Sequence, residues 1–370
     1  MTERRISSGS RMPTSSRSAG SRAGSSATRP ASGAAHARDE RRAADAASLL
    51  RVVTYNVRYF GHGTRGIAST SAAIRRIAGS LATLSPLPDL MCLQEVETQS
   101  LRSSTMNPPG RPEDTQLDQV MVELHAALAR AGKPDRYVAC YFPAHTYRLT
   151  ARTNIYTTGL AVIARDTLAF DHHNATRPHE ITCRDRVNSL KQTRICAHVS
   201  FQHASGQAFD VFNTHLSLPS VFSREFWTGE ARMGFGPNQL EEARVLAEFV
   251  RRERRSDSFV VVGDFNSLPG SPVDRYLREE GGLVDAFTRV RRLSEREARA
   301  FPTAGFMNLR MHLDHVYSSD RLEWVDFAGT HPFGQRGSFA GLSDHVPLIA
   351  RCRLPGAPAG SRAVPAAPPR

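Results

Sequence analysis

Six short segments of the chain place a polar or ionisable residue at the end of an apolar, strand-like run. They are TYNV with Asn56, LQEV with Glu95, NTHL with Asn213 and His215, GDFN with Asp264 and Asn266, LDHVY with Asp314 and His315, and LSDH with Asp344 and His345. A polar group at the end of a buried strand costs free energy unless it is hydrogen-bonded, solvated or bound to a metal. One such residue is ordinary, but six along one chain indicate a shared site.

The segments between them alternate further strand-like runs with amphipathic helical stretches. Strands are predicted at residues 50–57, 90–96, 137–142, 159–164, 194–201, 209–215, 259–263, 313–318 and 346–354. Helices are predicted at residues 71–84, 117–131, 239–252 and 271–280. Because strand–strand pairs outnumber strand–helix–strand units in the middle of the chain, we predict an α/β (α+β) fold of mixed sheets with helices outside.

The two ends of the chain have a different composition. Residues 1–48 consist almost entirely of Ser, Arg, Ala, Gly and Thr, and residues 355–370 are rich in Pro and Ala. Such stretches cannot bury enough apolar surface to offset the entropy of ordering them. We therefore predict a disordered basic arm at 1–48, one folded domain at 49–354 and a disordered tail at 355–370.

The charge of the chain suits an anionic partner without identifying one. The net charge is +12, but residues 1–48 hold nine Arg against four acidic residues and the tail holds two more Arg, which leaves about +5 on the folded domain. All basic residues except Lys133 and Lys191 are Arg. A coding bias explains this skew as well as a phosphate-binding surface does.

Several classes of protein are disfavoured by the sequence. No apolar segment follows the N-terminal charges, so no signal peptide is recognised, and no apolar run is long enough to span a membrane. Five Cys is a sparse, odd number, which suits a reducing compartment. We expect a cytoplasmic monomer, although Cys183 and Cys196 could pair if the protein were exported.

Two long segments without a periodic pattern lie at residues 98–116 and 216–238. Long loops in a compact domain are usually functional. The second carries four aromatic residues, namely Phe222, Phe226, Trp227 and Phe235. These rings could stack on bases, meet a lipid surface or pack on the domain, and the last reading is favoured.

The residue types in the six motifs fit one kind of reaction. They are carboxylates, amides and imidazoles, with no Cys cluster and no zinc-type His spacing. Oxygen ligands favour Mg²⁺, with Mn²⁺ as a substitute, over zinc. Phosphate-ester hydrolysis needs an activated water, stabilised charge and a protonated leaving group, and these groups can supply all three.

The ordered set of motifs resembles the endonuclease/exonuclease/phosphatase superfamily over residues 50–354. The resemblance implies a four-layered α/β sandwich, two packed mixed β-sheets flanked by helices, with a metal-dependent phosphoesterase site at one edge. It implies that Glu95 is the main metal ligand, with Asn56 beside it and Asp344 as a further acid near the metal.

The resemblance also implies roles for the other motif residues. Asp264 resembles the carboxylate that orients or deprotonates the attacking water, and Asn266 resembles the amide that binds the phosphate. His345 resembles the imidazole on the scissile phosphate, with Asp314 as its partner carboxylate, while His215 is a candidate for leaving-group protonation. Three residues are expected to bind substrate, namely Asn213, Lys191 and Arg194. His315 is expected to be an ordinary strand residue.

The motifs narrow the branch without identifying a substrate. His215 in NTHL argues against the AP-endonuclease branch, and Val262 and Ser267 around GDFN do not match inositol-phosphate phosphatases. The remaining resemblance is to deoxyribonuclease, sphingomyelinase and deadenylase branches. We favour a nucleic-acid phosphodiester as substrate. The alternatives are a phospholipid phosphodiesterase, a small-molecule phosphatase and a non-catalytic nucleic-acid-binding protein on the same fold.

Overall fold

A computed structural model of the chain describes residues 49–58, 69–97, 115–150, 153–183, 193–203, 206–219, 233–306 and 308–355. The predicted arm, nearly all of the predicted tail, Lys191 and most of the two long segments lie outside these residues. In the part that the structure describes, no helix combines the length and apolar character that crossing a membrane requires.

Six strands form the first sheet, in the order β14-β15-β1-β2-β4-β3. Their bounds are Leu49–Asn56 for β1, Leu90–Glu97 for β2, Tyr137–Thr150 for β3, Thr153–Arg165 for β4, Glu323–Asp326 for β14 and Leu348–Arg353 for β15. β1 and β2 run parallel, and the other neighbours run antiparallel. A parallel pair needs a crossover connection, and α2 (Ser69–Thr83) lies in the one between β1 and β2.

The second sheet has the order β10-β13-β9-β8-β7-β5, with β6 paired to β7. Its strands are β5 (Ala169–His173), β6 (His179–Glu180), β7 (Ile195–Gln202), β8 (Ala208–His215), β9 (Phe259–Asp264), β10 (Val284–Asp285) and β13 (Asp314–Ser318). Its one parallel pair among these residues, β8 and β9, is connected through α6 (Pro237–Glu253). The remaining elements are α4 (Gln116–Arg130), α7 (Pro272–Glu279), α8 (Ala286–Arg291), α9 (Glu295–Arg299) and the hairpin of β11 (Ala304–Phe306) and β12 (Leu309–Met311).

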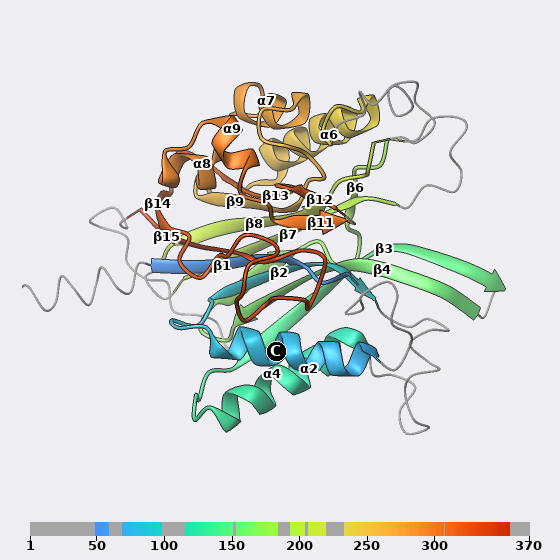
Figure 1. Cartoon of the computed structure of the whole chain (residues 1–370), viewed down its shortest axis with the longest axis vertical. Helices are drawn as coiled ribbons and strands as arrows, with labels where there is room; N and C mark the ends of the chain where they lie inside the picture. Colours follow the sequence, from blue (N-terminus) through green and yellow to red (C-terminus); the bar gives the residue numbers. More distant parts are fainter. Residues whose placement is uncertain are drawn as a thin grey trace, which may run out of the picture. The chain divides into compact units, whose positions relative to one another are not determined.

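Three apolar clusters hold these elements together as four layers. The cluster between the sheets contains Val52 from the first sheet and Val262 from the second. Helices α2 and α4 cover the outer face of the first sheet, while α6 and α7 cover that of the second. Figure 1 shows the helices on both sides of the stacked sheets. The fold is therefore the predicted four-layered α/β sandwich.

Strands β5, β6, β10, β11, β12 and β14 were not predicted, and β3 and β4 are longer than predicted. They pair from Tyr137↔Arg165 to Thr150↔Thr153, whereas the pairing of β2 with β4 ends at Glu97↔Thr158. Figure 1 shows the two strands projecting past the rest of the sheet. The apolar pattern predicted only 137–142 and 159–164, the part of the two strands that lies within the sheet. No disulfide joins Cys183 and Cys196 in this structure.

Candidate active site

Strand direction brings the motif residues to one edge of the sandwich. Asn56 and Glu95 stand at the end of the parallel strands β1 and β2, and His215 and Asp264 pair in register at the end of β8 and β9. β13 runs antiparallel to β9, so its first residue, Asp314, lies opposite Asp264. β15 likewise runs antiparallel to β1, which places the segment before it at the same edge.

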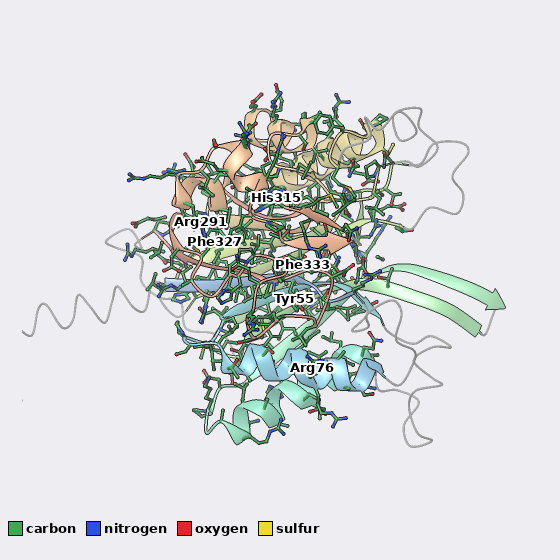
Figure 2. The ribbon with its side chains drawn as sticks, viewed as in Figure 1. Tyr55, Arg76, Arg291, His315, Phe327 and Phe333 are labelled. Carbon is green, nitrogen blue, oxygen red and sulfur yellow. The ribbon has the colours of Figure 1, made fainter. Side chains whose placement is uncertain are left out.

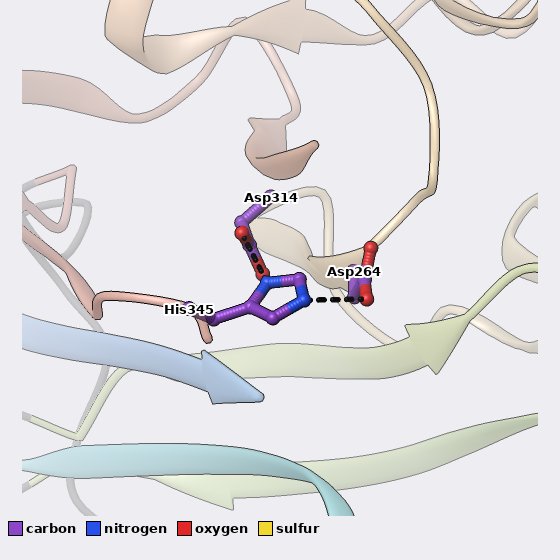
Figure 3. A group of neighbouring side chains, drawn as sticks. All are labelled: Asp264, Asp314 and His345. Atoms are coloured by element: carbon purple, nitrogen blue, oxygen red, sulfur yellow. Dashed lines mark hydrogen bonds and ion pairs between the residues drawn. The ribbon is translucent and has the colours of Figure 1, made fainter. Parts of the chain in front are cut away.

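His345 and Asp314 form the contact that the sequence predicts, across 31 residues of chain. The Nδ1 atom of His345 lies 2.9 Å from Oδ2 of Asp314, and its Nε2 atom lies 3.6 Å from Oδ2 of Asp264 (Figure 3). A carboxylate accepts, so Nδ1 donates and Nε2 faces the site. Burial lowers the pKa of His345, but Asp314, Asp264 and Asp344 outweigh it and raise the pKa to about 10. The ring is therefore an imidazolium at neutral pH.

Asp264 is the carboxylate on which the site converges. Its Oδ2 atom accepts a hydrogen bond of 2.9 Å from Nδ2 of Asn56 and lies 3.5 Å from Nε2 of His215. Its Oδ1 atom accepts from the backbone N–H of Asn266 at 2.9 Å. Burial is the largest cause that raises the pKa of Asp264 to about 7, against the lowering effect of His345. A carboxylate in this range can accept a proton near neutral pH.

His215 lies between two groups that can only donate. Nη1 of Arg194 is 3.0 Å from its Nδ1 atom, and Nδ2 of Asn266 is 3.2 Å from its Nε2 atom. A neutral ring accepts at one nitrogen only, and the charged guanidinium makes the stronger bond, which leaves the proton on Nε2. Burial, Arg194 and His345 hold the pKa of His215 well below its usual value. The ring is therefore neutral, with its single N–H directed into the site.

Glu95 owes its orientation to a local irregularity of β2. The register of β2 against β4 shifts between Leu93 and Val96, and Glu95 has a left-handed φ of 56°. This bulge re-aims the side chain at the site. Its Oε1 atom lies 3.4 Å from Nδ2 of Asn56 and 3.9 Å from Nε2 of His215.

These contacts decide which predicted ligands could hold a cation. Oδ1 of Asn56 accepts from the backbone N–H of Arg58 at 3.0 Å, so Asn56 presents its NH₂ group, not its oxygen, to the carboxylates. Asp344 forms an ion pair with Arg58. Within the described ranges Glu95 makes only the long contacts above, so its carboxylate keeps coordination capacity for a hard cation such as Mg²⁺.

Among the described residues, the ligand atoms of Asp264, Asp314 and His345 lie within 4.8 Å of one another. Asp314 and His345 share a proton, however, and a protonated nitrogen cannot bind a metal. The close spacing of these three residues therefore reflects the acid–base pair, and Glu95 with Asp264 offers the available oxygen donors.

A second buried set, Asp274, Asp285 and His315, is equally close-set. Nδ1 of His315 lies 3.2 Å from Oδ2 of Asp285, Nε2 donates to the carbonyl of Ser267 at 2.8 Å, and Tyr317 donates to Asp274 at 2.8 Å. Figure 2 shows His315 inside the domain. The carboxylates of Asp274 and Asp285 already accept hydrogen bonds from protein donors. We therefore interpret the set as a hydrogen-bond network that holds the loop after β9 in place.

The structure separates the three expected substrate-binding residues. Arg194 lies at the site, and a small open pocket beside it is lined by Arg194, His215 and Thr158 among others. Asn213 lies instead between the sheets, fully buried, where Nδ2 donates to the carbonyls of Leu93 and Ala161 at 3.1 Å each. No atom of Asn213 is left to reach a substrate. Lys191 lies outside the described residues.

Arg58 is a site residue that the sequence patterns did not mark. It follows Asn56 by two residues, has a left-handed φ of 42° and pairs with Asp344. In the sequence, the position of Arg58 just after TYNV is the only sign of a role in the site, and Arg58 resembles an ordinary surface Arg. Its contact with Asp344 spans 286 residues and could not be inferred from local pattern.

Comparisons with known proteins agree with this geometry. A family model described as "Endonuclease/Exonuclease/phosphatase family" matches residues 53–345. No curated protein sequence matches the chain. Solved structures do match, at sequence identities that show the fold alone.

Three of these structures illustrate the range. A protein of this family from Beutenbergia cavernae DSM 12333 is 20% identical with a TM-score of 0.52, over 85% of this chain and 74% of that one. ANGEL2, described as a 2′,3′-cyclic phosphatase, is 18% identical with a TM-score of 0.55, over 83% of this chain and 95% of that one. The mannosyl-6-phosphatase Bt3783 of Bacteroides thetaiotaomicron VPI-5482 is 14% identical with a TM-score of 0.52, over 82% and 98%.

Proposed function

We propose that the chain, which belongs to the Endonuclease/Exonuclease/phosphatase family, hydrolyses a phosphodiester by direct attack of water. The observation that carries the proposal is the convergence on Oδ2 of Asp264. Nε2 of His345 and Nε2 of His215 lie 3.6 and 3.5 Å from this oxygen, and Asn56 donates to it. A buried carboxylate between an imidazolium and a neutral imidazole is an arrangement for moving protons.

Each residue has a distinct part in the proposed reaction. Asp264 accepts the proton of the attacking water, because burial brings its pKa to about 7. His345, kept charged by Asp314, donates from Nε2 to a phosphate oxygen. His215 is neutral and keeps its proton, so it donates a hydrogen bond from Nε2 to the leaving oxygen, which takes its proton from solvent. Asn266 holds the phosphate beside it.

The proposal includes a divalent cation, Mg²⁺ by preference, at Glu95. Among the described residues, the carboxylate of Glu95 makes only the contacts of 3.4 and 3.9 Å to Asn56 and His215. When bound, the cation would neutralise charge on the phosphate. The chain's own residues then orient the water and the leaving group.

We further propose that the substrate is a nucleic acid. The folded domain keeps an excess of basic residues, and Arg194 brings one of them to the site beside His215. A substrate with a repeated phosphate backbone suits both features. A phospholipid and a small phosphate ester are the alternative substrates.

One panel tests the reaction and the substrate together. The purified full chain is incubated with Mg²⁺ or with EDTA against plasmid DNA, RNA, sphingomyelin micelles and bis-p-nitrophenyl phosphate. We expect cleavage of a nucleic acid with Mg²⁺ and none with EDTA. Cleavage of sphingomyelin alone, or binding of DNA without cleavage, would replace the nuclease proposal by the lipid or non-catalytic alternative.

Two variants test the place of the cation. Glu95→Gln should lower the rate by at least ~100-fold, since it removes the charge that would hold the cation. Glu241→Gln, on the exposed face of α6, is the control and should retain full activity. Full activity of either the natural chain in EDTA or Glu95→Gln in Mg²⁺ contradicts the proposed cation site.

A further inference from the structure

Asn266 connects the two sides of the proposed site and needs support to do so. Its backbone N–H donates to Asp264, while its Nδ2 atom donates to the carbonyl of Leu216 at 2.9 Å and lies 3.2 Å from His215. Its φ is 46°, in the left-handed region that is unfavourable for a residue with a side chain. Such a conformation costs roughly 1–3 kcal/mol and persists only where neighbouring groups hold it.

Gln239, in the first turn of α6, holds the carbonyl group of this strained residue. Its Nε2 atom donates to the carbonyl of Asn266 at 2.8 Å and to the carbonyl of Ser217 at 2.8 Å. Its Oε1 atom accepts from the N–H groups of Gly234 at 3.0 Å and Gly236 at 3.3 Å. The side chain is fully buried, and both of its donors and both of its acceptor positions are used.

The two carbonyls that Gln239 joins belong to the two loops of the site. Ser217 follows His215 by two residues at the end of β8, and Asn266 follows Asp264 by two residues at the end of β9. Gln239 therefore links the loop of the neutral imidazole to the loop of the carboxylate. No proton or substrate contact is required of it for this effect.

Glu242, one turn further along α6, supports the same loop. Its carboxylate accepts from the backbone N–H of Ser217 at 2.7 Å and from the hydroxyl of Ser217 at 2.7 Å. The backbone N–H, the hydroxyl and the carbonyl of Ser217 are thus all bound by the inner face of α6. Gln239, in contrast, also hydrogen-bonds the carbonyl of Asn266.

We propose that Gln239 is a positioning residue that acts through Asn266. It fixes the left-handed turn at Asn266 and, with it, the spacing between His215 and Asp264. The inference rests on the proposed function, because it concerns the role of Asn266 in turnover. Its loss affects the rate of the chemical step more than the binding of substrate.

The test is a double-mutant cycle with Gln239→Leu and Asn266→Ala, using kcat and KM for the substrate found in the panel above. Gln239→Leu should lower kcat by roughly 10- to 100-fold, since small misplacements in a site have effects of this size. KM should change by no more than about threefold. In the Asn266→Ala background, Gln239→Leu should lower kcat by no more than about twofold, because the residue through which it acts is gone.

Asn238→Leu is the matched control. Asn238 is the preceding residue of α6, is also buried, and donates from Nδ2 to the carbonyl of Leu218 at 3.1 Å, away from Asn266. This variant should lower the urea midpoint as Gln239→Leu does while leaving kcat within about threefold. If Gln239→Leu does not fold, Gln239→Glu takes its place, since it keeps the shape and removes the donors.

The outcomes separate the inference from the function on which it rests. If Asn266→Ala retains full activity, the role of Asn266 in the proposed function is wrong. If Asn266→Ala is impaired but the losses of the two variants multiply, Gln239 contributes stability only and the inference is wrong. A loss of kcat in Asn238→Leu equal to that in Gln239→Leu overturns it as well.

Discussion

Replacement of Asp314 by Asn should inactivate the site through His345. Asp314 is fully buried, its Oδ2 atom is 2.9 Å from Nδ1 of His345, and its Oδ1 atom has no hydrogen-bond partner in the part of the chain that the structure describes. Asn has nearly the same shape and can still accept from Nδ1. The variant therefore removes a charge from the pair while the packing stays almost unchanged.

The magnitude follows from the pKa of His345, which is raised from 6.5 to about 10. A shift of this size corresponds to ~5 kcal/mol of preference for the charged ring. Burial opposes that preference and Asp314 is the largest group that favours it, so the amide should lower the pKa of His345. Above that lowered pKa, loss of the proton at Nε2 should reduce kcat by roughly 10²- to 10⁴-fold.

The assay is the pH dependence of kcat/KM on a small phosphodiester. The active form carries the proton on His345, so activity is retained below its pKa and lost as the pH rises through it. We expect the alkaline limb of the natural chain near pH 10, and that of Asp314→Asn at a lower pH.

The control is Asp285→Asn, at a buried Asp–His pair outside the site. Asp285 lies 3.2 Å from His315, and its loss should lower stability while leaving the alkaline limb in place. An Asp314→Asn variant with the natural rate and the natural alkaline limb would refute the assignment of His345 as a donor held charged by Asp314.

Three further outcomes are expected. His215→Ala should lower kcat at least ~100-fold with an unchanged urea midpoint, and an unimpaired variant would exclude His215 from the reaction. Gly263→Ala should cost more than ~3 kcal/mol in urea unfolding, because its φ is 148° and a Cβ would lie 2.0 Å from the carbonyl of Thr214, whereas Gly282→Ala, with open space around it, should cost about 1 kcal/mol. Burial is the largest cause that lowers the pKa of His312 from 6.5 to about 4, so the unfolded chain binds this proton at a higher pH than the folded chain does. The free energy of unfolding should therefore fall by ~3 kcal/mol as the pH is lowered from 6.5 to 4, and His312→Asn should reduce this dependence on pH.

The sequence predicted the parts of the fold and site that depend on local pattern. The apolar runs marked the strands that carry Asn56, Glu95 and Asp264 at or near their ends, because burial on both faces leaves a continuous apolar signal. The four predicted helices agree with α2, α4, α6 and α7 within two residues, whereas the short helices α8 and α9 were not predicted. The contact between Asp314 and His345 was predicted from the order of motifs that the family resemblance supplied.

The structure does not support the prediction that Asn213 binds substrate. Asn213 and His215 lie two residues apart on β8 and so share a face of the strand. Their difference lies in position along the strand, since His215 reaches the edge of the sandwich whereas Asn213 lies between the sheets and accepts from Gln94 at 2.7 Å. Pattern gives the face of a side chain, but the depth at which it lies depends on where the partner sheet ends.

Backbone strain marks the site more sharply than composition does. Of the non-Gly residues with positive φ in the described ranges, Glu95 and Asn266 belong to the proposed site and Arg58 contacts it. Strained residues persist only where surrounding bonds over-determine them. For Asn266, one such bond comes from the buried side chain of Gln239 on α6. In the sequence, Gln239 looks like an ordinary polar residue of a helix. The groups that hold the site in shape are therefore the ones that sequence pattern hides, because their role depends on three segments meeting in space.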